Sequence, residues 1–276
     1  VMSLSTLRNL NFKSNSNELC AVVGKVGSGK SSLLSVMNGE MDRLEGNVWL
    51  KGSVAYVPQQ PFIQNCTVKE NILFGLPFDS ERYERVLEAC ALIPDLEILA
   101  SGDETEIGEK GINLSGGQRA RIALARAAYA DADIYLLDDV LSAVDTHVGN
   151  HIMKNCISTL LSDKIRIFVT NGMQYLPNCD RVLVLNDGYI AEEGKYNDLC
   201  NSPVSDNPVF HSLLSAYKTT ATSSSNTSGL SSFLSPSNSI DTSIICSPIH
   251  NSVAFGSCLS SSTISSNSID VGGYLN

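Results

Sequence analysis

Short apolar runs alternate with stretches of helical periodicity along residues 1 to about 218. Runs of this length bounded by Gly, Asn, Asp or Ser predict buried strands, whereas apolar positions three and four apart predict helices. The predicted strands occupy residues 18–24, 46–50, 53–59, 132–139, 165–171 and 180–194. The predicted helices occupy residues 31–39, 79–91 and 119–130. Strands that alternate with helices predict an α/β domain with a mostly parallel sheet.

Two segments predict specific local structures, a capped amphipathic helix and a hairpin turn. In residues 79–91, Tyr83, Val86, Leu87 and Cys90 fall on one helical face that follows an Asp79/Ser80 cap. In residues 180–194, the Asp187–Gly188 pair predicts a tight hairpin turn. We expect residues 70 to about 130 to be mostly helical and to form a subdomain.

The composition changes after Lys218. Residues 219–276 are rich in Ser, Asn and Thr and contain neither Lys nor Arg. Such a segment buries too little apolar area to offset the entropy of ordering, so we expect a disordered linker or tail. The folded domain is then expected to span residues 1–218.

Composition and charge exclude several classes of protein. The chain of 276 residues has a net charge of −10, which argues against non-specific nucleic-acid binding. Its eight cysteines include no CxxC pair, which argues against a zinc or dithiol site. His147 and His151 are spaced to share a metal ion on a helix, but no third ligand is close in sequence. No run of about 18 apolar residues predicts a membrane span.

A glycine-rich segment, GKVGSGKS, lies between a predicted strand and a predicted helix. It fits the phosphate-binding pattern G-x-x-x-x-G-K-[ST] in the context that the pattern requires. Its glycines let successive backbone N–H groups face a phosphate, and the helix N-terminus adds a favourable dipole. Lys30 is expected to reach the β- and γ-phosphates, and the Ser31 hydroxyl to bind Mg²⁺. The predicted nucleotide-binding residues here are Gly24, Lys25, Val26, Gly27, Ser28, Gly29, Lys30, Ser31 and Ser32.

A second motif, LSGGQ at residues 114–118, precedes a helical run. Ser115 and Gln118 have the spacing of a capping box, which accounts for those two residues. A capping box leaves Gly116 and Gly117 unexplained, because glycine disfavours a helix. A backbone that must approach an anion closely explains them, so we predict that Ser115, Gly116, Gly117 and Gln118 bind a nucleotide.

With these two motifs the sequence resembles the ATP-binding cassette (ABC) family over residues 3 to 217. The resemblance is greatest to the first nucleotide-binding domain of the C subfamily, the multidrug-resistance-associated transporters. It rests on GSVAYVPQQPFIQN, KENILFG, EIGEKGINLSGGQ and DDVLSAVDTHVG. The resemblance implies a P-loop NTPase cassette with an N-terminal antiparallel β part, truncated here, and a helical signature subdomain. It also implies ATP and Mg²⁺ as cofactors.

The resemblance assigns further roles. Gln59 corresponds to the Q-loop residue that contacts Mg²⁺ and the attacking water, and Asp138 to the Mg²⁺-binding acid. Residues 142–145 resemble the D-loop, which contacts a second cassette in a head-to-tail ATP sandwich. The stretch around ENILFG is expected near the intracellular loops of transmembrane domains. The implied location is therefore the cytoplasmic face of a membrane, as part of a transporter.

Departures from the family pattern concern catalysis. Asp139 stands where a competent site has Glu and is one CH₂ shorter, and Asn171 replaces the switch histidine. Val140 replaces the usual proline, and the adenine-stacking aromatic would fall just before Val1. With Asp139, Gln59 and Asn171 as the catalytic set, we expect Mg-ATP binding with slow or no hydrolysis. The signature would complete the partner's site.

Three interpretations follow. The leading one is an ATPase domain of an ABC exporter that pairs with a second cassette to drive transport. A non-hydrolysing regulatory or channel-gating cassette is the second, because Asp139 and Asn171 weaken the site. A soluble ABC ATPase that is not a transporter is the third, although ENILFG argues against it.

Overall fold

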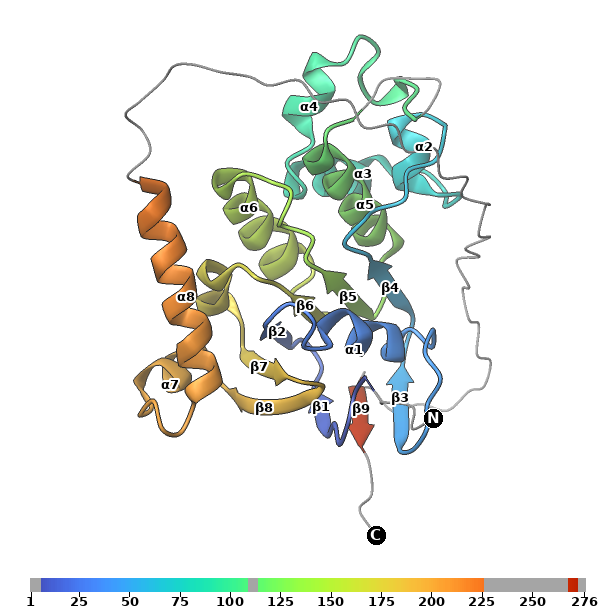
Figure 1. Ribbon diagram of the computed structural model, residues 1–276. Helices are drawn as coiled ribbons and strands as arrows, with labels where there is room; N and C mark the ends of the chain where they lie inside the picture. Colours follow the sequence, from blue (N-terminus) through green and yellow to red (C-terminus); the bar gives the residue numbers. More distant parts are fainter. Residues whose placement is uncertain (1–5, 109–113, 226–267, 273–276) are drawn as a thin grey trace, which may run out of the picture.

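The computed structural model of the chain describes residues 6–108, 114–225 and 268–272 (Figure 1). A six-stranded sheet lies at its centre, parallel except for the antiparallel pair β7–β8. Its strands, in spatial order, are β4 (Val54–Val57), β5 (Ile134–Asp138), β6 (Ile165–Val169), β2 (Leu19–Gly24), β7 (Arg181–Asn186) and β8 (Tyr189–Gly194). The predicted α/β fold with a mostly parallel sheet is confirmed.

The central strands are buried along their whole length, as strands covered on both faces should be. Alternate residues of β5 enter different cores. Tyr135 and Leu137 join the core beneath the helices that follow β4, whereas Ile134 and Leu136 join the core beneath α1 (Lys30–Met37). The sheet therefore lies between two packed layers, which hold in place the loops at the carboxyl ends of its strands.

The stretch expected to be helical contains four α-helices, which gather at one end of the molecule (Figure 1). They are α2 (Val68–Leu73), α3 (Ser80–Ala89), α4 (Ile93–Ile98) and α5 (Gly116–Ala130), with a short 3₁₀ helix η1 (Gly102–Glu104). Asp79 caps α3 as predicted, and Tyr83, Val86, Leu87 and Cys90 are all buried. The predicted hairpin joins β7 to β8 at Asp187–Gly188.

The remaining helices follow β5 and pack beside the sheet. They are α6 (Thr146–Ile152), which continues into the π-helical η2 (Met153–Leu160), the 3₁₀ helix η3 (Met173–Asn178), α7 (Tyr196–Asn201) and α8 (Pro208–Ser225). Within the described ranges no helix combines the length and apolarity needed to cross a bilayer.

A second, antiparallel sheet has the order β1 (Phe12–Ser14), β9 (Ser268–Gly272), β3 (Asn47–Lys51). Strand β9 comes from the segment expected to be disordered, and α8 also extends past Lys218. The rest of that segment, residues 226–267 and 273–276, lies outside the described residues. β9 pairs with both β1 and β3, so each of its edges finds backbone hydrogen-bond partners. The amino-acid composition of residues 219–276 could not reveal these partners.

Candidate nucleotide site

The segment between β2 and α1 forms the predicted glycine-rich loop. A side chain at Gly24 would put its Cβ 2.3 Å from the Leu185 carbonyl oxygen and 2.5 Å from Ser28 Oγ. Gly29, the N-cap of α1, has a φ of 101°, a conformation that other residues rarely adopt. The loop therefore depends on glycine for its close backbone packing and for the entry into α1.

Lys30 lies inside this loop. Its ammonium donates to the carbonyl oxygens of Gly24 at 2.8 Å and Lys25 at 3.0 Å. Burial lowers the pKa of Lys30, and the nearby carboxylates of Asp139 and Asp138 oppose that shift. The cation is thus held between the loop and two acids, where it can meet the terminal phosphates of a nucleotide.

A second polar group of the loop, the Ser28 hydroxyl, is also suited to bind an anion. The hydroxyl of Ser28 is buried and has no hydrogen-bond partner among the described residues. Buried hydroxyls are normally paired, so this one suits a phosphate oxygen. Lys25 and Val26 are exposed, and the Val26 side chain packs against little of its own chain, with 96% of its surface exposed.

Asp138 ends β5 and is 4% exposed. Burial raises its pKa, while a hydrogen bond from the Ser31 hydroxyl opposes the rise. A buried carboxylate beside a hydroxyl is the kind of oxygen pair that Mg²⁺ binds, usually together with substrate phosphates. The structure therefore brings together two of the three predicted Mg²⁺ ligands, Ser31 and Asp138.

Gln59, the third predicted ligand, contacts Asp139. Its side-chain amide donates to Oδ2 of Asp139 at 3.3 Å. Asn171 donates to the same oxygen from its side chain at 3.0 Å, and its backbone N–H lies 3.4 Å from Oδ1. The three predicted catalytic residues thus form one hydrogen-bonded cluster on the second aspartate.

The backbone at Asp139 turns sharply, with a φ of 51°. The Asp139 carbonyl accepts from the Ser142 hydroxyl at 2.7 Å and from the Ser142 amide at 3.1 Å. Val140 is buried directly after the turn. These contacts fix the backbone turn that carries the Asp139 side chain and join it to the start of the 142–145 segment.

The predicted capping box at the start of α5 is present. The Ser115 hydroxyl accepts from the Gln118 amide, and the Gln118 side chain accepts from the Ser115 amide. A Cβ on Gly117 would lie 2.9 Å from the Ala143 carbonyl oxygen, whereas one on Gly116 would meet only the Ala143 Cβ, at 3.8 Å. Gly117 therefore has a packing reason within this chain, which the sequence did not reveal.

Both signature glycines lie beside Ala143 of the 142–145 segment. No hydrogen bond joins Ser115, Gly116 or Gly117 to the glycine-rich loop in the part of the chain that the structure describes. A cavity of about 460 Å³ separates the Gln59 loop from the start of α5. Arg119, Asp139, Ser142 and Ala143 are among the residues that line it.

The histidine pair lies on α6. No cluster of three or more His, Cys, Asp or Glu side chains with metal-site geometry occurs among the described residues. The His151 ring instead contacts the Glu88 carbonyl oxygen at 2.8 Å and lies beside Asn155. The ring thereby links α6 to α3.

One residue beside the site was missed from the sequence. Tyr175 is 3% exposed and packs against Gly172, the neighbour of Asn171, and against Gly149 of α6. Gly149 and Tyr175 are 26 positions apart in the sequence, and Tyr175 lies outside the motifs quoted above, although Gly149 is the last residue of DDVLSAVDTHVG. No local sequence signal could have identified it.

The sequence of this chain is similar to those of known ABC transporters. Residues 7–142 match the family model described as ABC transporter. The chain is 58% identical over 197 residues to ATP-binding cassette sub-family C member 2 of Mus musculus, covering 71% of this chain and 13% of that protein. It is 58% identical over 193 residues to sub-family C member 3 of Homo sapiens, covering 69% and 13%. ABC transporter C family member 12 of Dictyostelium discoideum is 52% identical over 211 residues, covering 76% and 16%. The chain thus spans a small part of the length of each of these relatives.

Proposed function

This chain carries an ABC transporter nucleotide-binding domain homologous to the C-subfamily transporters, and from that premise we propose that its own site binds Mg-ATP but hydrolyses it slowly. The single observation that carries the proposal is the shared use of Asp139 Oδ2 by the Gln59 and Asn171 amides. A carboxylate that accepts two hydrogen bonds on one oxygen has less capacity to orient a water molecule.

Binding is supported by the residues of the glycine-rich loop. Lys30 and the unpaired Ser28 hydroxyl offer charge and a donor for phosphate, and the N-terminus of α1 adds its dipole. Ser31 and Asp138 are suited to hold Mg²⁺, which when bound neutralises phosphate charge.

Slow hydrolysis is supported by the two substituted positions. Asp139 is one methylene shorter than Glu, which withdraws its carboxylate from a substrate by more than about 1 Å, and such a displacement can cost about 10²-fold in rate. Asn171 carries a neutral amide, which donates a hydrogen bond but cannot carry a positive charge or transfer a proton as histidine can. One of its two N–H donors is engaged with Asp139.

The signature residues are proposed to act on a different nucleotide. Ser115, Gly116 and Gly117 lie at the start of α5, where both glycines face Ala143, and among the described residues no hydrogen bond joins them to the glycine-rich loop, so we assign them to a nucleotide held by a second cassette. In this proposal the two domains form a head-to-tail ATP sandwich, at the cytoplasmic face of a membrane, that drives export through transmembrane domains. Intracellular loops of those domains would contact the helical part of the chain.

The test is nucleotide binding and turnover by the chain. We expect Mg-ATP binding with little steady-state phosphate release, and a rise of about 10²-fold in Asp139→Glu/Asn171→His. Asp139→Asn/Asn171→His is the matched control, because it restores the histidine without a carboxylate. Brisk turnover by the unmodified chain would overturn the proposal.

A non-hydrolysing regulatory cassette is the second candidate, favoured by the same Asn171–Asp139 contact. It is distinguished by the fate of bound ATP. Recovery of intact ATP from the protein after hours, in the unmodified chain and in the presence of a second cassette, would favour this function over slow hydrolysis.

A further inference from the structure

Tyr175 lies between two segments that border the nucleotide site. An ideal Cβ on Gly172 would come within 2.9 Å of two Tyr175 ring carbons, and one on Gly149 within 2.2 Å of the Tyr175 hydroxyl oxygen. Gly172 directly follows Asn171, and Gly149 belongs to α6, which begins after the 142–145 segment. The Tyr175 side chain is therefore in direct contact with the backbone of both segments.

Gln174 connects this ring to α8. Its Oε1 accepts a hydrogen bond from the Tyr217 hydroxyl at 2.7 Å. Burial raises the pKa of the Tyr175 hydroxyl, and the neighbouring Gln174 amide opposes that rise. An amide offers an acceptor at one end and donors at the other, so the contact with Tyr217 orients the NH₂ group toward Tyr175. That NH₂ group would lie 3.1 Å from a Cβ on Gly172, so it too touches the neighbour of Asn171.

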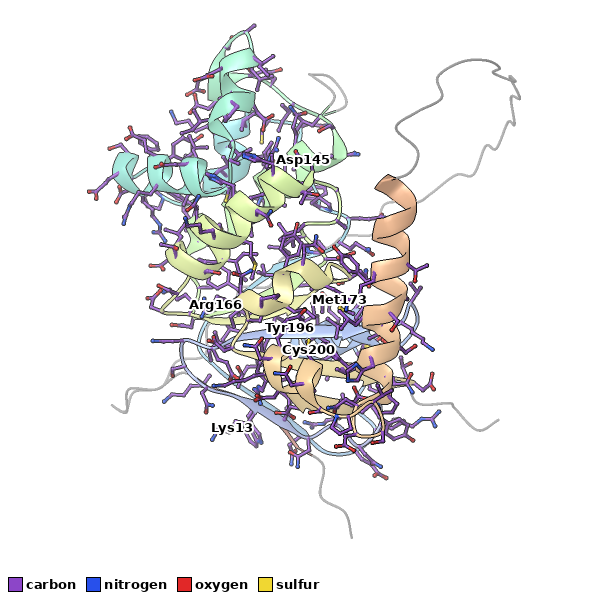
Figure 2. The ribbon with its side chains drawn as sticks, turned by 90° about the vertical axis from the view of Figure 1, so that its left-hand side faces the viewer. Lys13, Asp145, Arg166, Met173, Tyr196 and Cys200 are labelled. Carbon is purple, nitrogen blue, oxygen red and sulfur yellow. The ribbon has the colours of Figure 1, made fainter. Side chains whose placement is uncertain are left out.

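Helix α8 is itself firmly placed on the domain. The Glu192 carboxylate accepts from the backbone N–H groups of Val209 at 2.7 Å and Phe210 at 2.8 Å. The Phe210 side chain is completely buried. Tyr217 follows Phe210 by about two helical turns and therefore faces the same side. Figures 1 and 2 show α8 running beside η3, near the labelled Met173.

We propose that Tyr217 and Gln174 are positioning residues that couple α8 to the two segments at the nucleotide site. In this role Tyr217 holds Gln174, Gln174 holds Tyr175, and Tyr175 sets the backbone at Gly172 and Gly149. A displacement of α8 then changes the placement of Asn171 and of the segment that precedes α6. The functional meaning of that change rests on the proposed function, whereas the coupling itself does not.

The test uses the backbone amides of Gly172 and Gly149 as reporters in the full, nucleotide-free chain. In Tyr217→Phe, which keeps the ring and loses the hydroxyl, we expect both amide resonances to shift. We expect their hydrogen exchange to quicken by about three- to tenfold, the value of one net hydrogen bond. Gln174→Glu, which keeps an acceptor for Tyr217 but loses the donor to Tyr175, should move the same two resonances.

Ser215→Ala is the matched control, because the exposed Ser215 hydroxyl bonds only to the His211 carbonyl of the same helix. It should leave both glycine amides unchanged. The proposal is overturned if Tyr217→Phe leaves Gly172 and Gly149 as the Ser215→Ala control does. Failure of the unmodified chain to bind Mg-ATP would overturn the proposed function alone, since the reporters need no nucleotide.

Discussion

The side-chain amide of Asn171 donates a hydrogen bond to Oδ2 of Asp139, with 3.0 Å between the two atoms. Gln59 donates to the same oxygen at 3.3 Å. The contact makes the two substituted positions parts of one unit rather than independent defects. A change at either position therefore alters the environment of the other, and their effects on turnover should not be additive.

Single substitutions separate the two contributions. Asp139→Glu alone should raise turnover by about tenfold or more, because the longer side chain recovers the lost reach. Asn171→Ala alone should change turnover by less than about threefold, because Gln59 still donates to Oδ2 of Asp139 and the carboxylate stays short. Single-turnover release of phosphate from Mg-ATP measures both. A large gain in Asn171→Ala would instead identify Asn171 as the inhibiting group.

The two signature glycines should respond differently to alanine. Gly117→Ala places a methyl group 2.9 Å from the Ala143 carbonyl, backbone that cannot move freely, and should destabilise the chain by about 1–3 kcal/mol. Gly116→Ala is the matched control, with only a 3.8 Å contact, and its higher helix propensity should leave stability equal or up to about 1 kcal/mol higher. Urea unfolding of both variants measures the difference. Equal stabilities would contradict the packing role assigned to Gly117.

The sequence predicted features whose cause is local. The Asp79 cap, the buried face of α3 and the Asp187–Gly188 hairpin each depend on residues within one element, and each is confirmed. The ligand role predicted for Gly117 stays a prediction, and its contact with Ala143 could not be predicted because it depends on the packing of two distant segments. Strand β9 was missed for the same reason, since its partners β1 and β3 are more than 200 positions away.

The N-cap of α6 gives a pH-dependent prediction. Asp145 accepts from the amides of Val148 and His147, each at 3.0 Å, and these bonds hold its pKa below the usual value. Because the pKa of Asp145 is lower in the folded chain than in the unfolded chain, its charged form stabilises the fold. This stabilisation is fully present above the unfolded-state pKa, about 4, and is lost as the pH falls through the folded-state pKa. The melting-temperature advantage over Asp145→Asn should therefore shrink with acidification. A constant difference from pH 7 to pH 3, or the same trend for the exposed Asp42→Asn, would contradict this.

Substitution of Arg166 should lower the free energy of unfolding more than substitution of Arg85. Its side chain is 4% exposed, and its guanidinium donates to the carbonyls of Lys164 at 3.1 Å, Ile157 at 3.0 Å and Asn17 at 2.6 Å (Figure 2). These bonds tie β6 to η2 and to the turn before β2.

Removal of that guanidinium leaves the buried Ile157 carbonyl and the part-buried carbonyls of Lys164 and Asn17 without this donor, so Arg166→Met should cost about 2–4 kcal/mol. Arg166→Lys should recover only part of this, because one ammonium cannot reproduce the planar set of donors that serves three carbonyls. Arg85→Met, on the exposed face of α3, is the control and should stay within about 0.5 kcal/mol of the unmodified chain. Urea midpoints followed by circular dichroism, at unchanged slope, measure all three. An Arg166→Met midpoint equal to that of Arg85→Met would show that water or a rearranged backbone satisfies those carbonyls, and that the guanidinium does not hold the three segments together.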